Sequence, residues 1–336
     1  MIPMRRVVLF AVICAVVGGG AASAAPTLRM SLPPVFEALP IAFAEAWGLF
    51  DAEGVSVELV GITDNQERST ALLTGNLDAV MSDVSRALLD YSSARDLVIT
   101  GCAASTPQSD SVPLGLLSHV GFGAGTLAEL LASTGKIGTS YRTDDEYMLD
   151  QLLIANGIAK GWSMRYMYFN DPLQLAIWFA AQTVPVAVLR EPYISYIATY
   201  HPPTGAPPSL AWLSTFQGIA PLPSAVVFRK AFVRDNPESV RAFYRAYAAA
   251  VERVNATPRD ELIEVGLSVV LGLFFQGANA ASVPQEALDA ISIPHFESPG
   301  PLAEQTFSQM VAWMLKKGYL YGRPEYGAVV DSGYLP

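Results

Sequence analysis

The sequence predicts an exported α/β protein with two lobes, and three observations lead to this prediction. Residues 31–83 alternate short apolar strands with amphipathic helices, the pattern of consecutive βαβ units that build a parallel sheet. Two crossings between lobes are predicted, near 103–112, where the sequence is Ser/Pro-rich and aperiodic, and near 212–224. The N-terminus combines positive charge, an apolar run and small residues, as secretory signals do.

The first βαβ units justify the α/β assignment in detail. A strand ending at Leu32 leads into a helix over about 37–47, where apolar residues recur at helical spacing. A strand of period two over 55–60 follows, then a helix over 67–73 and an apolar strand over 77–83. Ligands of open α/β sheets bind beside the carboxyl ends of the strands, so we expect the loops after these strands to carry the site.

The rest of the chain continues the alternation. Further strands are predicted over 97–103, 114–120, 136–140, 162–169, 184–189 and 224–228. Further helices are predicted over 85–91, 126–133, 143–157, from 172 onward, and over 236–251 with an apolar stripe of Val240, Phe243, Tyr244, Tyr247 and Val251. Thr143 and Glu146 have the spacing of a capping box at a helix start. The remainder is predicted to be helical, with a Pro/Ser/Gly-rich break over 292–301.

The N-terminal segment predicts where the protein is sent. Arg5 and Arg6 precede the apolar run 7–17, and Ala22 to Ala24 supply small residues for cleavage after Ala24. The apolar run is well short of the roughly 20 residues that span a bilayer. No later segment is long and apolar enough to span one, so we expect a soluble mature chain.

Composition excludes several function classes. The chain is 51% hydrophobic and 15% charged, which is typical of a globular protein with a large core. Its 31 acidic residues outnumber its 21 basic ones, which disfavours nucleic acid as a partner. Cys102 is the only cysteine after the signal, so neither an intramolecular disulfide nor a cysteine zinc site is expected. No nucleophile elbow, P-loop or H-E-x-x-H motif occurs, so we expect no enzyme, no metal and no cofactor.

Two runs of residues also carry a family resemblance. The run AFAEAWGLFDAEGVSVELV at 42–60, followed by ALLTGNLDAVMSD at 71–83, resembles the opening of periplasmic solute-binding proteins of the nitrate/taurine/alkanesulfonate/thiamine-precursor group. The resemblance implies a two-lobed, hinged periplasmic-binding-protein-like fold of type II, with the ligand in the cleft between the lobes. The expected organisation is a signal peptide at 1–24, a discontinuous first lobe at 25–112 and 216–336, and an inserted second lobe at 113–215.

The resemblance also implies the function. We expect a monomeric, periplasmic substrate-binding component of an ABC importer, which captures a small-molecule ligand and delivers it to a permease with its ATPase. The bulky loop 138–146 and the abundant aromatic residues favour a heteroaromatic vitamin or precursor, such as riboflavin or a thiamine pyrimidine. A sulfonate, taurine or nitrate anion is the alternative ligand. A thiamine-pyrimidine-synthase-like enzyme and a periplasmic sensor subunit are the alternatives of another class.

Candidate ligand-binding residues of the first lobe lie in the loops after its strands. Phe36 would stack on a ligand and Glu37 would accept hydrogen bonds from it. Purely structural roles explain the two residues equally well: Phe36 as a hydrophobic staple and Glu37 as an acid in the first turn, which the helix dipole favours. A polar ligand would also find hydrogen-bonding groups at the start of the helix that Asp64 caps. Further such groups lie at the end of the strand over 77–83. These further candidates are Asn65, Gln66, Ser82 and Asp83.

Candidate residues of the second lobe lie after its own strands. Free N–H groups at a helix start attract anions, and the loop at 138–143 precedes such a start. Asp144, Asp145 and Glu146 already complement that helix dipole and would repel an anion, whereas Arg142 would pair with a carboxylate or phosphate, or stack on a ring. The alternative is that this loop is exposed to solvent and pairs with nearby acidic residues instead of binding a ligand. The candidates are Ser140, Tyr141, Arg142, Asn170, Asp171 and Glu191.

Overall fold

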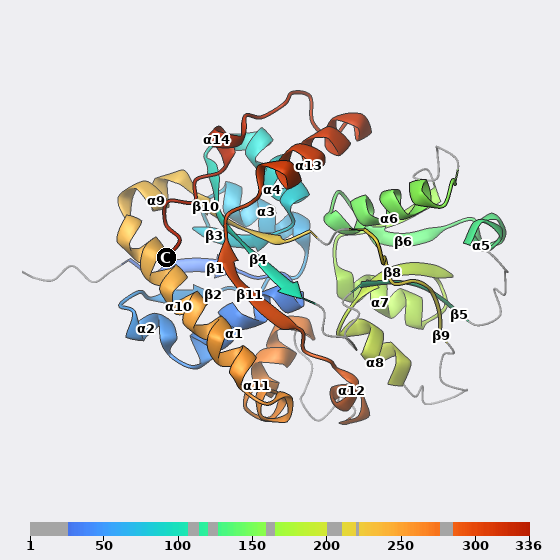
Figure 1. Cartoon of the computed structure of the whole chain (residues 1–336), viewed down its shortest axis with the longest axis horizontal. Helices are drawn as coiled ribbons and strands as arrows, with labels where there is room; N and C mark the ends of the chain where they lie inside the picture. The colour runs from blue at the N-terminus through green and yellow to red at the C-terminus, as the bar shows by residue number, and fades with distance from the viewer. Residues whose placement is uncertain are drawn as a thin grey trace, which may run out of the picture.

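The computed structural model describes residues 26–106, 114–119, 127–158, 165–199, 210–219, 222–275 and 285–336. Within them the chain forms two α/β lobes, each built on its own sheet (Figure 1). The predicted α/β class is therefore confirmed. In these ranges no helix is both long enough and apolar enough to cross a membrane. The predicted signal peptide at 1–24 lies outside the described residues.

The first lobe contains a six-stranded sheet in the order β11-β4-β10-β3-β1-β2. Strands β1, β2 and β3 are parallel, and Met30 lies opposite both Leu59 and Ala79 in the register. Strand β10 returns from the second lobe and inserts antiparallel between β3 and β4. The strands are β1 (Leu28–Ser31), β2 (Val57–Leu59), β3 (Ala79–Ser82), β4 (Leu97–Thr106), β10 (Ser224–Arg229) and β11 (His295–Gly300).

The second lobe contains a five-stranded sheet in the order β7-β6-β8-β5-β9. Strands β6, β7 and β8 are parallel, and β5 is antiparallel to both β8 and β9. The strands are β5 (Leu114–His119), β6 (Ile137–Ser140), β7 (Tyr166–Phe169), β8 (Val186–Arg190) and β9 (Leu210–Ser214). The chain passes between the sheets after β4 and after β9, while the lobe boundaries at 113 and 215 stay predictions.

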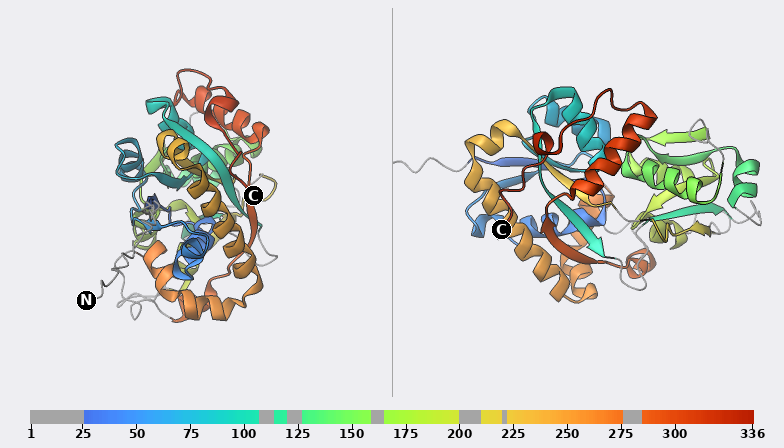
Figure 2. Two further views of the ribbon diagram at one scale, coloured as in Figure 1. Left: turned by 90° about the vertical axis from the view of Figure 1, so that its left-hand side faces the viewer. Right: turned by 45° about the horizontal axis from the view of Figure 1, so that its top comes forward.

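Helices cover both sheets, and α13 of the first lobe reaches α6 of the second (Figure 2). The first lobe has η1 (Phe36–Ala38), α1 (Leu39–Ala46), α2 (Leu49–Ala52), α3 (Asn65–Leu73), α4 (Val84–Ala94), α9 (Lys230–Asp235), α10 (Pro237–Ala256), α11 (Arg259–Phe274), α13 (Glu304–Lys317) and α14 (Tyr326–Val329). The second lobe has α5 (Leu127–Thr134), α6 (Asp144–Ala155), α7 (Pro172–Ala180) and α8 (Tyr193–Thr199), and α12 (Gln285–Ala290) packs on α8.

The predicted apolar stripe of α10 forms the centre of the first lobe's core. All five of its residues are at most 2% exposed, and Phe243 contacts the rings of Phe50, Phe228 and Tyr247. Apolar side chains at intervals of three and four residues lie on one face of a helix, so the stripe packs as one surface. This sequence prediction is confirmed.

Several predicted details are wrong for identifiable reasons. Helix α3 begins at Asn65 instead of 67, because the Asp64 carboxylate accepts hydrogen bonds from the backbone N–H groups of Gln66 and Glu67, each at 2.8 Å. The break predicted over 292–301 contains the edge strand β11, which pairs with β4. Strand β9 was not predicted, because the region near 212 was assigned to a crossing.

The predicted capping box at Thr143 does not form. The hydroxyl of Thr143 turns back and donates to the carbonyl of Ser140 at 3.0 Å, so it caps no N–H group of α6. Arg142 adopts a left-handed backbone conformation with φ of 57°, and its own N–H donates to Oε2 of Glu146 at 3.0 Å. The carboxylate of Glu146 therefore accepts from the N–H group of Arg142, the residue before the cap, and not from that of the cap residue Thr143.

Candidate functional site

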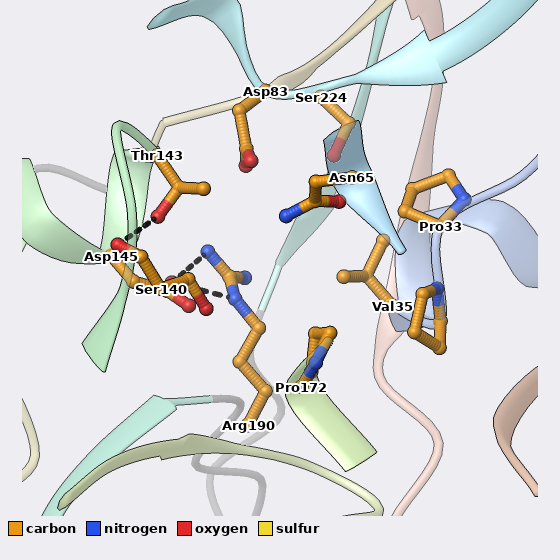
Figure 3. Close-up of a pocket in the computed structure, with 11 residues that line it drawn as sticks. Pro33, Val35, Asn65, Asp83, Ser140, Thr143, Asp145, Pro172, Arg190 and Ser224 are labelled. Carbon is orange, nitrogen blue, oxygen red and sulfur yellow. Dashed lines mark hydrogen bonds and ion pairs between the residues drawn. The ribbon is translucent and has the colours of Figure 1, made fainter. Parts of the chain in front are cut away.

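A small cavity lies between the two lobes, at the carboxyl ends of their parallel strands (Figure 3). The space open to the centre of a water molecule is about 20 Å³, enough for about one water. An organic solute would therefore need the lobes to move apart. The first lobe supplies Pro33, Pro34, Val35, Asn65, Asp83 and Ser224 to the lining, and the second supplies Ser140, Thr143, Asp145, Pro172 and Arg190.

The sheet topology explains why these residues meet. The segment 33–35 follows β1 and Asp83 follows β3, while Ser140 ends β6 and Arg190 ends β8. Parallel strands present their carboxyl ends at the same edge of a sheet, and the two edges face each other across the cavity. The loops after the strands therefore line the cavity from both sides, as the βαβ pattern predicts.

Arg190 and Asp145 form an ion pair within the cavity wall of the second lobe. Nε and Nη2 of Arg190 lie 2.7 and 2.5 Å from Oδ1 of Asp145, and the two side chains are only 19% and 9% exposed. Burial alone would lower the pKa of Arg190, but attraction to Asp145, Glu37 and Asp83 outweighs it and raises that pKa. Arg190 is therefore a permanent cation whose charge is shared among several carboxylates.

Asp83 enters the cavity without a hydrogen-bond partner. Its side chain points into the cavity (Figure 3) and caps no N–H group of α4, and none of the described residues donates to it. Burial, followed by repulsion from Asp144, raises the pKa of Asp83 to about 8, while Arg190 and Arg68 oppose this shift. Near neutral pH the carboxyl group is therefore largely protonated, and it can donate one hydrogen bond to a solute and accept others.

Asp144 joins the two lobes by capping a helix of the opposite lobe. Its carboxylate accepts hydrogen bonds from Val84 N at 3.2 Å, Ser85 N at 3.1 Å and Ser85 Oγ at 2.6 Å, all at the start of α4. Burial raises the pKa of Asp144, while the bonds from Ser85 oppose the shift. A helix start is a natural anion site, and here the protein's own carboxylate occupies it.

The acidic residues at the start of α6, which were predicted to complement the helix dipole and to repel an anion, are buried. Asp144, Asp145 and Glu146 are 3%, 6% and 0% exposed. Asp144 caps α4, Asp145 pairs with Arg190, and Glu146 contacts α13. Contacts with the first lobe hold Asp144 and Glu146, and Arg190 of the second lobe holds Asp145, none of which a reading of the helix alone reveals.

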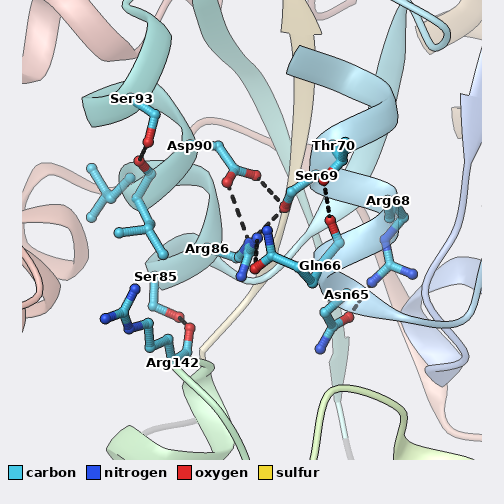
Figure 4. A network of polar contacts seen from close by, with 12 residues as sticks. Asn65, Gln66, Arg68, Ser69, Thr70, Ser85, Arg86, Asp90, Ser93 and Arg142 are labelled. Atoms are coloured by element: carbon cyan, nitrogen blue, oxygen red, sulfur yellow. Dashed lines mark hydrogen bonds and ion pairs between the residues drawn. The ribbon is translucent and has the colours of Figure 1, made fainter. Parts of the chain in front are cut away.

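A polar network of the first lobe holds the start of α3 in place (Figure 4). Arg86 donates to Ser69 Oγ at 2.6 Å and to Gln66 Oε1 at 3.0 Å, and it lies 3.3 Å from a carboxylate oxygen of Asp90. Asn65 Oδ1 accepts from Arg68. The amide nitrogen of Asn65 consequently faces the cavity (Figure 3), whereas Gln66 is already engaged by Arg86.

A second set of contacts, which we call the clasp, closes the lobes beside the cavity. It consists of Trp313, Lys317 and Tyr319 of the first lobe with Glu146 and Asp150 of α6. Lys317 Nζ lies 2.7 Å from Glu146 and 3.1 Å from Asp150. The hydroxyl of Tyr319 donates to Glu146 at 2.8 Å, and Nε1 of Trp313 donates to Asp150 at 2.8 Å. The clasp therefore connects residues that lie far apart in the sequence.

Of the predicted site residues, Asn65, Asp83 and Ser140 line the cavity. Phe36 instead packs edge-on against Phe274, with ring centroids 5.6 Å apart. The guanidinium of Arg142 lies 4.7 Å from the ring centroid of Tyr141 and 4.9 Å from that of Tyr319. These two side chains of the 138–146 loop are thus placed against the clasp.

The other predicted residues have partners within the protein. Asn170 accepts the backbone N–H of Asn65 through its carbonyl at 3.1 Å, and Asp171 caps α7 by accepting from Leu173 N at 2.8 Å. Glu191 accepts from the N–H and hydroxyl of Ser195. Ser82, Glu37 and Gln66 are also absent from the described lining. Whether any of the predicted residues contacts a ligand stays a prediction.

Sequence reasoning missed several residues of the lining. Arg190 directly follows the strand predicted over 184–189, where the rule of strand ends gave its neighbour Glu191 as the candidate. Ser224 begins a predicted strand, so that rule does not point to it. Asp145 and Thr143 carried no local signal beyond their place at a helix start. The remaining missed residues are Pro33, Pro34, Val35 and Pro172.

The raised pKa of Asp83 predicts how stability depends on pH. Between about pH 4 and pH 8 the folded protein keeps a proton that the unfolded chain has lost, so the free energy of unfolding should fall as the pH rises, by up to about 1.4 kcal/mol per unit. The charged groups facing Asp83 are Asp144, Asp145, Arg190 and Arg68. Urea unfolding of the wild type and Asp83→Asn at several pH values tests this. A profile equally steep in the variant would contradict the assignment to Asp83.

Together the two sheets, the crossings and the cavity between the lobes define the class: the chain has the two-lobed fold of periplasmic solute-binding proteins. No family model and no curated protein sequence matches it. Among solved structures it is similar to the alkanesulfonate-binding protein SsuA from Xanthomonas axonopodis pv. citri bound to MOPS, at 18% identity and a TM-score of 0.66 over 92% of this chain and 99% of that one.

Two further solved structures have the same fold. The periplasmic nitrate-binding protein NrtA from Synechocystis PCC 6803 has 12% identity and a TM-score of 0.68 over 92% of this chain and 87% of that one. The periplasmic aliphatic sulphonate binding protein SsuA from Escherichia coli has 12% identity and a TM-score of 0.63 over 91% and 92%. These likenesses confirm, at the level of the fold, the resemblance first noted from residues 42–83.

Proposed function

We propose that this protein is the substrate-binding component of an ABC importer, that it acts in the periplasm and that it catalyses no reaction. The observation that carries the proposal is the cavity between the lobes, lined from both sides by polar side chains at strand ends. A solute bound there contacts both lobes, so it favours the closed form and gives a permease a distinct surface to recognise. The similar structures are named for binding or import of solutes, which supports the same role.

The expected preference for a heteroaromatic vitamin receives no support. The similar proteins are named for alkanesulfonate, aliphatic sulphonate and nitrate, and none of those shown is named for a vitamin. Phe36, the expected stacking residue, packs against Phe274, and the ring of the candidate Tyr141 lies against the guanidinium of Arg142. We therefore propose the alternative ligand class, a small solute with a sulfonate- or nitrate-type oxyanion. Ser140, the Asn65 amide and Arg190 are the groups that would donate to its oxygens.

A thermal-shift panel on refolded, ligand-free protein tests this function. The panel contains short alkanesulfonates with and without an amino group, nitrate, riboflavin and thiamine pyrimidines. A solute at 100 times its dissociation constant adds about 2.7 kcal/mol, which should raise the melting temperature by several degrees. We expect shifts with sulfonates and none with flavin. Mass spectrometry should recover the bound solute unchanged, and a chemically altered product would contradict a transport role.

A substitution in the cavity wall tests whether a rise in melting temperature comes from a solute bound in the cavity. Ser140 is 3% exposed and lines the cavity, so Ser140→Ala should weaken the binding of a responding sulfonate several-fold through the lost hydrogen bond. Ser93 is exposed, its hydroxyl donates only to its own helix, and Ser93→Ala is the matched control. Equal affinities for both variants would remove Ser140 from the binding site.

A further inference from the structure

We propose that Asp144 holds the empty protein closed and so opposes the entry of its solute. The aspartate belongs to the second lobe and bridges to the start of α4 in the first lobe, beside the cavity. This bridge is an autoinhibitory contact, because a solute must break it before it can bind. The inference rests on the proposed function, since it concerns access to the same cavity, but closure of the empty protein is measurable without any solute.

The first argument is the composition of the bridge. The Asp144 carboxylate accepts hydrogen bonds from Ser85 Oγ at 2.6 Å, Ser85 N at 3.1 Å and Val84 N at 3.2 Å. Asp144 is 3% exposed, and Ser85 and Val84 are 0% exposed. Hydrogen bonds to a charged acceptor are stronger than those between neutral groups, and shielding from water strengthens them further. Every member of the bridge belongs to the protein, so the bridge closes the lobes without a solute.

The second argument is that the start of α4 relies on this bridge. Asp83 has the extended backbone of an N-cap residue, with φ of −60° and ψ of 149°, yet its side chain caps no N–H group of the helix. It points into the cavity instead (Figure 3). An aspartate at this position normally accepts from the N–H groups of the first turn itself. Asp144 takes this role from the opposite lobe, so the first N–H groups of α4 lose their acceptor when the lobes separate.

The third argument is that the bridge and a bound solute exclude each other. Thr143 and Asp145, which flank Asp144 in the chain, line the cavity, and so does Asp83, which precedes Val84. The bridge therefore lies at the edge of the cavity. While the bridge holds, the space open to a water centre is about 20 Å³, enough for about one water. An organic solute needs more room, and the lobes can provide it only by moving beyond hydrogen-bonding distance of each other.

The fourth argument is that the bridge and the clasp act on the same helix. Helix α6 is tied to α4 through Asp144 and to α13 through Glu146, whose carboxylate lies 2.7 Å from Lys317 Nζ. Two sets of bonds thus favour the empty closed form. When the form that can bind is only a fraction of the protein, the apparent affinity is lowered by that fraction. Weakening the bridge should therefore tighten solute binding, whereas loss of a contact that supports the bound form would weaken it.

Small-angle scattering of the solute-free protein tests the closure directly. Asp144→Ala removes the acceptor of the bridge and should have a larger radius of gyration than the wild type. Ser85→Ala removes the hydroxyl donor and leaves the charge unchanged, so its increase should be smaller. Asp235→Ala and Ser93→Ala are the matched controls, because both residues are exposed and Ser93, also on α4, donates only to its own helix. Both controls should keep the wild-type radius.

Calorimetric titration with ethanesulfonate and with nitrate tests the effect on binding. We expect Asp144→Ala to bind the responding anion about tenfold more tightly than the wild type, because the competing closed form becomes rarer. Ser85→Ala should bind it several-fold more tightly for the same reason. The serine variant is essential, because removing the charge of Asp144 would by itself favour an anion. Tighter binding in Ser85→Ala cannot arise from a change of charge.

Each outcome bears on the inference. Wild-type radii in both Asp144→Ala and Ser85→Ala would overturn it, whether or not any anion binds. Tighter binding confined to Asp144→Ala, without expansion, would show that the aspartate acts through its charge and would overturn it as well. Expansion together with weaker binding would show that the bridge also supports the bound form, which contradicts autoinhibition.

The inference and the proposed ligand class fail in different ways. Expansion of the solute-free variants, when neither anion binds, would support the bridge and contradict the proposed ligand class. An unchanged circular dichroism spectrum distinguishes separated lobes from an unfolded chain. If Asp144→Ala did not fold, Ser85→Ala would carry the test, because the backbone donors to Asp144 remain in that variant.

Discussion

Replacing Lys317 by methionine is expected to lower the free energy of unfolding by about 3 kcal/mol and to separate the lobes. Lys317 is the cation of the clasp, within 2.7 Å of Glu146 and 3.1 Å of Asp150. The Glu146 side chain is 0% exposed, so the variant leaves a buried carboxylate without its counter-charge. Removing one partner of a buried ion pair costs about 3–5 kcal/mol, and the remaining hydrogen bonds from Tyr168 and Tyr319 favour the lower value.

Urea unfolding measures the loss of stability, and small-angle scattering measures the separation of the lobes. Lys316→Met is the matched control, because Lys316 is exposed one residue earlier on the same helix. The control should leave both stability and radius of gyration unchanged. If Lys316→Met and Lys317→Met behaved alike, the clasp would not hold the lobes together. If Lys317→Met lost stability without any expansion, the clasp would stabilise the fold but not its closed form.

Replacing Arg190 by methionine is expected to cost about 3–5 kcal/mol of stability and to abolish solute binding. The Asp145 side chain, 9% exposed, would lose the guanidinium that lies 2.5 Å away. Arg190 also lines the cavity, so the variant removes a donor for the solute's oxyanion. The loss of binding should therefore exceed what the loss of stability explains.

A double variant separates the two roles of Arg190. Arg190→Met combined with Asp145→Leu removes both members of the ion pair, so the part of the stability lost through the unpaired Asp145 should return while binding stays absent. Arg234→Met is the matched control, because Arg234 pairs with Asp235 in full solvent and should change neither property. Stability that stays low in the double variant would show that Arg190 acts through contacts other than Asp145.

The fold was predictable wherever local pattern decides it. The stripe of α10 and the βαβ alternation over 31–83 follow from helical and strand periods that any local reading detects. Strands β9 and β11 were not predicted, because each is an edge strand that exists through its pairing with a distant strand. Pairing partners in a sheet carry no local signature, so edge strands in Pro-rich or Gly-rich sequence are the first to be missed.

The candidate site was only partly predictable. The rule that ligands bind at the carboxyl ends of strands led to Asn65, Asp83 and Ser140, all of which line the cavity. The same rule offered Tyr141 and Gln66, whose side chains are engaged by Arg142 and Arg86 instead. The rule locates the loop but does not determine which of its side chains faces the cavity.

The sequence by itself determined the α/β class, the covered parallel strands and the loops in which to look for a site, because these depend on the order of apolar and polar residues over short distances. Only the tertiary structure decided which partner each charged side chain meets and how deeply it is buried. Asp145 meets Arg190, Asp144 meets Ser85, and Glu146 meets Lys317. Each pair joins residues distant in the sequence. Burial between packed elements turns acids that would be solvated on an isolated helix into a partner of Arg190, a cap of α4 and a part of the clasp.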